Sequence, residues 1–355
     1  SDLIGTAAGA TSNAGPTFAE TPSAFTERVI TFAHARPTDL GRIALSVSLS
    51  DRLYTAFDPA YEWTGAATFE LAKDWGGQQS ILAFAASSGR DVEERLSEVT
   101  LSFAHARTDG AVRPYAKGEV ALLDFRDIPD PVAPFRNQDD RDRISARGEI
   151  GLRLTLTDHV DLEIGAGLDG KRYLARTDDF GVGRDSLSPF GVIGLAYTGE
   201  RGSLKAVYMP FLRTFRDDLF ADVVKHGYVI EGEAKLTDKL KVLAATRYGF
   251  EETDFLIASS AYERVVLGGL VLTLDGGATV SLAASQSWRS YEDLDLVEVT
   301  RADRKFEVAL VGEMPLIGNL SLNGRLSYLD YMSSFGDVGT DALTASMGLT
   351  YTEAR

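Results

Sequence analysis

The sequence contains no cysteine, only 4 histidines and 11 prolines, and no long apolar run. Without cysteine there can be no disulfide bonds, thiolate metal sites, iron–sulfur clusters or cysteine nucleophiles. A membrane-spanning helix needs about 20 mostly apolar residues. The longest uncharged apolar run, from Val265 to Leu274, is about half of that length. The sequence therefore excludes a helical membrane protein and several classes of cysteine chemistry.

Basic residues are outnumbered by acidic ones, with 36 Lys and Arg against 52 Asp and Glu and a net charge of −16. Because phosphate binding needs clustered Lys and Arg, we expect no nucleic-acid partner. The chain begins Ser1-Asp2-Leu3, without the basic start and apolar run of a leader. We therefore expect either a cytoplasmic protein or a mature chain whose leader has been removed. The mean hydropathy of −0.07 is compatible with a membrane barrel, whose strands show lipid an apolar residue only at every second position.

Alternation of apolar and polar residues is the dominant pattern. From Ile144 to Leu156, every second residue is apolar or glycine, and most residues between them are polar. This period of two predicts a long, half-buried strand. The same pattern recurs at 160–168, 242–250, 280–288, 306–314 and 320–328. Segment 260–274 is apolar at both sets of positions, so the alternation leaves its orientation open.

Short and long connections alternate along the chain. The short ones carry the Asp, Asn and Gly of tight hairpin turns and lie at 74–77, 108–110, 157–159, 237–239, 275–277 and 317–319. The longer polar ones lie at 125–141, 176–186, 252–259, 292–303 and 332–340. This order is typical of an outer-membrane barrel, which has turns on the periplasmic side and loops outside.

We predict an all-β fold, a transmembrane antiparallel up-and-down β-barrel in the bacterial outer membrane. About 17 strand-like segments lie between residues 27 and 351, and bacterial barrels have even counts. We therefore expect about 18 strands, with 16 as the fallback. Residues 1–25 would form an N-terminal segment, either the first strand or a lumen plug, and 26–355 the barrel. The alternatives are a soluble sandwich, solenoid or propeller, but a propeller strand has only about 5 residues.

Aromatic residues gather near the predicted strand ends, among them Tyr248, Tyr262 and Trp288. In membrane barrels, such residues form girdles at the two interfaces. The alternative is the ordinary preference of aromatic residues for strands.

No catalytic motif is visible, so we expect no enzyme. The four histidines, His34, His105, His159 and His226, form no i, i+4 pair and lie near no Gly-x-Ser-x-Gly. Acidic clusters occur at 139–142, 177–179, 251–254 and 292–295. Their oxygens suit Ca²⁺ or Mg²⁺, but none has the spacing of a calcium loop. We interpret them as solvated loop charge and expect neither a metal nor a cofactor.

The polar face of the strands is the predicted functional surface, because in a barrel it would line the pore. Its charged and amide residues carry both signs, which suits selection of a solute. The alternative is that they pair with each other across strands. The pore-lining candidates are Arg143, Arg147, Glu149, Arg153, Asp161, Glu163, Lys241, Arg247, Arg289, Lys305, Glu307, Asn323 and Arg325.

Residues from about 140 to 351 resemble the proteobacterial outer-membrane family called β-barrel porin 2. The matching pieces are Tyr173, Gly183-Arg184-Asp185-Ser186, Gly194-Leu195-Ala196-Tyr197, Arg213-Thr214-Phe215-Arg216-Asp217 and Ser290-Tyr291-Glu292-Asp293. The resemblance implies a pore that exports an exopolysaccharide. Its partners would be outer-membrane lipid, lipopolysaccharide, the polysaccharide and its export machinery. The alternatives are a general diffusion porin for small solutes, a closed structural or docking barrel for a surface assembly, and a soluble all-β protein.

Overall fold

The computed structural model describes residues 25–54, 61–90, 94–127, 141–177, 181, 183–216, 223–252, 258–293, 302–318, 320–334 and 338–351. The strands are β1 (Phe25–Thr38), β2 (Gly41–Tyr54), β3 (Tyr61–Asp74), β4 (Gln78–Arg90), β5 (Glu94–Arg107), β6 (Val112–Asp127), β7 (Arg143–Thr157), β8 (Val160–Tyr173), β9 (Ser186–Gly199), β10 (Gly202–Phe215), β11 (Val223–Lys235), β12 (Leu240–Glu252), β13 (Ala258–Thr273), β14 (Thr279–Asp293), β15 (Ala302–Pro315), β16 (Leu320–Ser333) and β17 (Val338–Tyr351). Within these residues, no helix is long and apolar enough to cross a membrane.

Each strand pairs with its neighbour in the chain. The register is continuous from Phe25↔Tyr54 to Thr38↔Gly41 in the first hairpin, and from Leu320↔Tyr351 to Ser333↔Val338 in the last. Strands β2 to β9 and β10 to β17 follow each other in chain order, with β1 beside β2 and β9 beside β10. The chain is thus an antiparallel up-and-down sheet, which confirms the predicted fold class.

The structure describes 17 strands of 13 to 16 residues. The fallback count of 16 is therefore too low, because more strands than that are present among the described residues alone. The eighteenth strand was predicted within residues 1–25, of which only Phe25 is described, as the first residue of β1. That part of the prediction lies outside the described residues.

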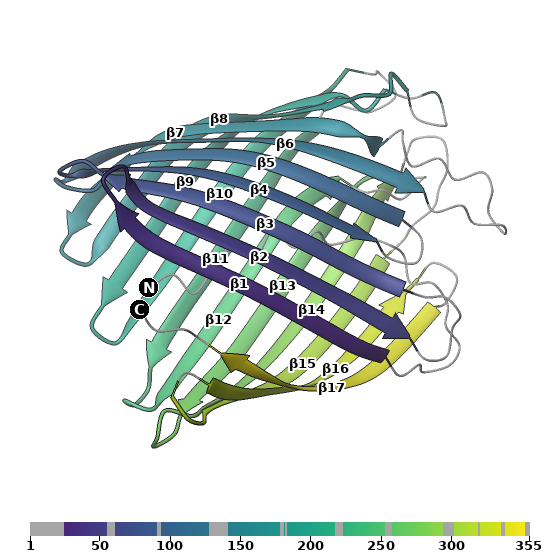
Figure 1. The fold of residues 1–355 in the computed structure, drawn as a ribbon. Helices are drawn as coiled ribbons and strands as arrows, with labels where there is room; N and C mark the ends of the chain where they lie inside the picture. The colour runs from purple at the N-terminus through teal and green to yellow at the C-terminus, as the bar shows by residue number, and fades with distance from the viewer. Residues whose placement is uncertain are drawn as a thin grey trace. The chain divides into compact units, whose positions relative to one another are not determined.

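The predicted short turns are confirmed, and so are the long connections at 125–141 and 176–186, whereas the loops predicted at 252–259 and 332–340 are shorter, because β13 begins at Ala258 and β17 begins at Val338. Short turns join β3 to β4, β5 to β6, β7 to β8, β11 to β12, β13 to β14 and β15 to β16, while the connections from β6 to β7 and from β8 to β9 are long. In β1–β6, the β1–β2, β3–β4 and β5–β6 turns lie at the same end of the strands (Figure 1). The β13–β14 turn needs Gly276 and Gly277, whose φ angles of 90° and 84° are unfavourable for other residues.

The chain divides into two compact units. The first takes its described residues from Ser1–Gly151, Ala166–Pro189 and Arg213–Ala221, and the second from Leu152–Gly165, Phe190–Leu212 and Asp222–Arg355. Both consist of strands.

One face of the strands exposes large apolar side chains. In the first unit these include Leu101 and Phe103, which are 51% and 46% exposed. In the second, Leu282, Leu310 and Leu326 are directly paired across β14, β15 and β16, and each is about half exposed. Only eight apolar residues are buried in the described part of the chain. Water disfavours such an apolar surface, so this face is in contact with the hydrocarbon of a bilayer.

The alternation left the orientation of segment 260–274 open. The pairing of β13 with β12 and β14 determines which of its residues lie on the apolar face. Leu270 pairs with Leu282 and with Val242, so even-numbered residues of β13 share the apolar face. Glu263 lies on the other face. Because Leu267, on that other face, is also apolar, the sequence of β13 alone could not distinguish the two orientations.

Candidate functional site: the polar face of the strands

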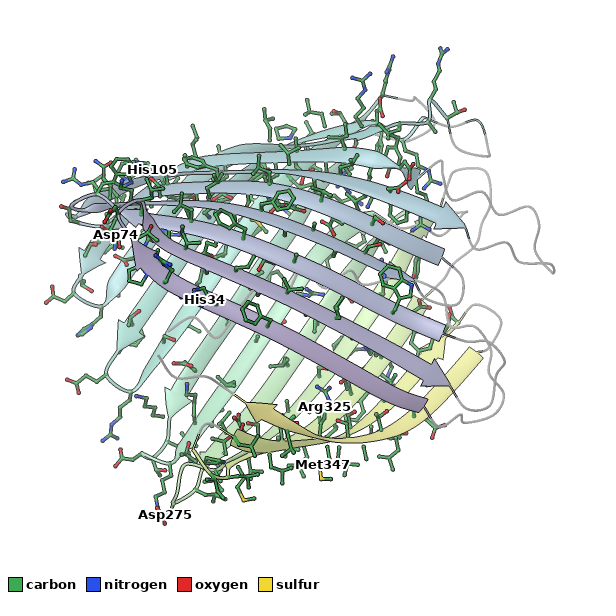
Figure 2. All side chains as sticks on the ribbon, viewed as in Figure 1. His34, Asp74, His105, Asp275, Arg325 and Met347 are labelled. Atoms are coloured by element: carbon green, nitrogen blue, oxygen red, sulfur yellow. The ribbon has the colours of Figure 1, made fainter. Side chains whose placement is uncertain are left out.

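The face opposite the apolar one carries all thirteen predicted residues. On β7, Arg147, Glu149 and Arg153 alternate with Ile150 and with other exposed apolar residues. On β15 and β16, Glu307 and Arg325 alternate with the apolar residues that pair across these strands. Figure 2 shows Arg325 and Met347, on the neighbouring strands β16 and β17, on opposite sides of the sheet.

In the first unit, Glu149 is a buried carboxylate that contacts the buried Tyr115 and the partly exposed Lys117. Its carboxylate accepts a hydrogen bond of 2.8 Å from the Tyr115 hydroxyl and one of 3.2 Å from the Lys117 ammonium group. The Lys117 Nζ also lies 4.7 Å from the centre of the Tyr115 ring. Glu149 is only 9% exposed. A carboxylate so buried is stable because its partners replace water.

Arginines and aromatic rings alternate near the ends of β6, β7 and β8 beside the long connections. The Arg141 guanidinium lies 4.2 Å from the Phe125 ring, and that of Arg143 lies 5.4 Å from Phe125 and 5.8 Å from Tyr173. Both rings are buried. The Phe125 backbone N–H donates to Asp142 at 2.6 Å, which fixes the strand end. This arrangement, which we call the arginine–aromatic cluster, presents cations over rigid rings.

Ion pairs join neighbouring strands along the polar face. In the first unit, Arg147 lies 3.9 Å from Asp169. The pairs of the second unit are Arg153–Glu163 at 3.4 Å, Lys205–Glu231 at 3.9 Å, Lys241–Glu233 at 3.0 Å and Arg247–Glu263 at 2.7 Å. Asp161 accepts a hydrogen bond of 2.9 Å from Thr155. The basic partners are a quarter to more than half exposed, so water reaches this face.

The polar face of β14, β15 and β16 carries a second set of contacts. Glu307 lies 3.7 Å from Lys305 and 2.8 Å from Arg325. Asp303 is buried and accepts hydrogen bonds from Tyr291 at 3.0 Å and Ser333 at 2.6 Å.

Two candidates take part in contacts other than ion pairs. The Arg289 guanidinium lies 5.3 Å from the Tyr291 ring. The second unit therefore also contains an arginine beside an aromatic ring, like the arginine–aromatic cluster of the first unit. Asn323 lies beside Gly348 of β17, where a Cβ atom would come within 2.8 Å of its Oδ1.

Sequence reasoning missed the partners of these residues. Tyr115 and Lys117 of β6 contact Glu149, Asp169 of β8 contacts Arg147, and Glu263 of β13 contacts Arg247. The buried Asp303 of β15, with its partners Tyr291 and Ser333, was also missed. Their alternation was visible in the sequence, but their pairing depends on the register between strands. The predicted candidates stay candidates for lining a pore.

The histidines take part in local contacts. The Nδ1 atoms of His105 and His159 lie 2.8 Å from the Ser80 hydroxyl and 3.0 Å from the Thr198 carbonyl, while that of His226 lies 2.6 Å from the Tyr208 hydroxyl. No group of three His, Asp or Glu side chains that could hold a metal ion occurs in the described part of the chain.

A groove of about 520 Å³ lies on the apolar face of the first unit. It is lined by Gly118, Gly148 and Gly170 between larger residues such as Phe103 and Leu168. Because its walls belong to the lipid-facing side, it is not a site for a polar solute.

A sheet of 17 up-and-down strands with one apolar face in lipid and one charged, hydrated face defines an outer-membrane β-barrel. No family model matches the sequence, and no curated protein matches it.

Solved outer-membrane transporters share the fold. The FrpB iron transporter from Neisseria meningitidis gives a TM-score of 0.57 and 9% identity over 92% of this chain and 66% of that one. The copper transporter OprC gives 0.52 and 12% over 94% and 64%. The chain thus spans slightly less than two thirds of the length of these proteins. At such identity the likeness concerns the fold. The names of these proteins describe transporters and no enzyme.

Proposed function

We propose that the chain is an outer-membrane channel whose polar face lines a water-filled passage. The observation that carries the proposal is the set of hydrated ion pairs across neighbouring strands. The side chains of Arg153, Arg247 and Arg325 are 42%, 58% and 49% exposed although each is paired. Charged groups in a closed, dry lumen would be costly to bury, whereas the wall of an aqueous pore solvates them.

The number of strands supports a channel of porin size. Barrels of 16 to 18 strands leave an aqueous passage, whereas the lumen of 22-stranded transporters is plugged. The 17 described strands fall within the first range.

The substrate that we propose is an acidic polysaccharide that leaves the cell. The resemblance to the β-barrel porin 2 family supports export, and the arginine–aromatic cluster supports an acidic chain. Arg141 and Arg143 are held over Phe125 and Tyr173, so their guanidinium groups are positioned to meet carboxylates at a small cost in side-chain entropy. Successive carboxylates of the polymer can then bind one guanidinium group after the other.

The first experiment measures conductance of the purified full chain in planar bilayers. We expect stable open channels, reduced conductance on addition of polygalacturonate, and a weaker effect of neutral dextran of matched size. The variant Arg141→Gln/Arg143→Gln should keep the conductance and lose most of the preference for the acidic polymer. Arg201→Gln/Lys235→Gln, next to short turns and outside this cluster, is the matched control.

Bilayers without any conductance would contradict the channel and favour a closed docking barrel. In cells, deletion of the gene should abolish surface polymer. Normal polymer in the deletion strain would contradict export.

Diffusion of small solutes is the second candidate, since the ion pairs of the polar face largely neutralise one another. It predicts open channels that neither polymer blocks.

A further inference from the structure

We propose that the apolar face of β13, β14 and β15 binds a phosphorylated glycolipid of the outer leaflet through Arg264 and Arg304. This lipid site is independent of what passes through the barrel. It rests on a row of residues that the strand registers place side by side on the lipid-facing side of the second unit.

The row contains two arginines that flank a tryptophan. Tyr248 pairs with Arg264, Arg264 with Trp288, and Trp288 with Arg304. The Arg264 guanidinium lies 5.7 Å from the Trp288 ring. Further along the row, Tyr248 and Tyr228 stack with their rings 5.7 Å apart. These residues share the parity of Leu270, Leu282 and Leu310, so they lie on the apolar face.

The row marks the border of the apolar band. On β15, the residues with the parity of Arg304 run through Val308 and Leu310 to Met314, next to the short turn. Ten residues span about 34 Å along a strand, which a tilt of about 45° reduces to about 24 Å across the membrane. This matches the apolar band of about 25 Å in outer-membrane barrels. Arg264, Trp288 and Arg304 therefore lie at the level of the headgroups.

The connections at the two ends of β15 indicate in which leaflet the row lies. Arg304 is near the β15 end that adjoins the long connection, whereas Met314 is next to the short turn. Because turns are periplasmic and loops are extracellular, the row lies in the outer leaflet.

Among the described residues, the two arginines have no acidic partner, unlike Arg247 and Arg325 of the polar face. Arg264 and Arg304 are both exposed. The acid nearest in register on this face, Asp330, pairs with Phe306, one row closer to the turns. At the membrane interface an arginine keeps its guanidinium group at the headgroup level, where a lipid phosphate can accept hydrogen bonds from it in bidentate geometry.

The shape of the face fits a lipid rather than a free ion. Arg264 and Arg304 are two strands apart, or about 10 Å, and Trp288 between them is 42% exposed and offers its ring to a sugar or acyl chain. Nearer the turns, Gly268 pairs with Ala284. A Cβ atom added at Gly268 would touch nothing within 4 Å. Acyl chains can therefore lie close to the backbone below the phosphates.

The test measures binding of diphosphorylated lipid A to the purified full chain in detergent by native mass spectrometry. We expect Arg264→Gln/Arg304→Gln to bind about a hundredfold more weakly, because the loss of each arginine's charged contact with a phosphate weakens binding by about tenfold. Arg264→Lys/Arg304→Lys should retain most of the affinity. The matched control is Arg201→Gln/Lys235→Gln, which removes two cations near the short turns that follow β9 and β11.

Two competing ligands separate the sources of phosphate. Lipid A without its phosphates should bind the unaltered chain as weakly as the double glutamine variant binds lipid A. Inorganic phosphate at millimolar concentration should not displace lipid A. Equal binding of dephosphorylated lipid, displacement by inorganic phosphate, or unchanged affinity of the double glutamine variant would each overturn the proposal.

Discussion

At the residue scale, Glu149 shows how hydrogen-bond partners stabilise a buried carboxylate on a strand face. Its two partners, Tyr115 and Lys117, satisfy the carboxylate that burial deprives of water. We predict that Glu149→Gln lowers the free energy of unfolding by about 1 to 3 kcal/mol, because the amide cannot form the same charged hydrogen bonds. Urea unfolding in lipid vesicles measures the change. Glu119 is exposed and lies on the same face of β6 as Tyr115 and Lys117. Glu119→Gln should therefore change the free energy of unfolding by no more than about 0.5 kcal/mol. Equal destabilisation in both variants would refute this role of Glu149.

At the element scale, neighbouring turns support each other. The Thr108 backbone N–H donates to the Gly77 carbonyl at 2.8 Å. Asp109 lies against Gly77, where an added Cβ atom would clash with its carboxylate. A hydrogen bond of 2.7 Å from Arg107 orients this carboxylate and holds the pKa of Asp109 below its ordinary value. The β3–β4 and β5–β6 turns thus meet at Gly77.

We predict that Gly77→Ala destabilises the chain more than Gly76→Ala. Both glycines have positive φ angles, 88° and 60°, so each alanine costs about 1 to 2 kcal/mol from the backbone. At Gly76 the space is open, whereas at Gly77 the Asp109 carboxylate must also move. Urea unfolding of the two variants in the same vesicles gives the difference. Identical midpoints and slopes would show that the contact between the turns adds nothing.

The elements were predictable from the sequence because alternation and turn residues are local. β7 and the β13–β14 turn were found in this way, since one face of β7 is apolar and Gly276 and Gly277 suit a tight turn. The contacts were not predictable. The pairing of Lys117 with Glu149 spans a long connection whose length does not determine the register. The orientation of β13 is likewise decided by its partners β12 and β14, because both of its faces are apolar.

At the scale of the whole molecule, the two faces explain the composition. Lipid-facing leucines and valines and the charges of the polar face average to a mean hydropathy near zero. Ion pairs neutralise much of the charge on the strands, so the net charge of −16 is not concentrated there. The absence of cysteine also provides a clean background for labelling.

The sidedness of the molecule follows from its connections and is tested by single cysteines. We predict that a membrane-impermeant maleimide labels Arg216→Cys and Ser334→Cys in intact cells, because these exposed residues follow the ends of β10 and β16 that lie opposite the short β9–β10 and β15–β16 turns. Asp74 is the last residue of β3 before a short turn, and Asp275 lies in the β13–β14 turn (Figure 2). Asp74→Cys and Asp275→Cys should therefore be labelled only after the outer membrane is permeabilised. The cysteine-free parent chain controls for background. Labelling of Asp275→Cys in intact cells, with Ser334→Cys protected, would invert the orientation and move the lipid site of Arg264 and Arg304 to the inner leaflet.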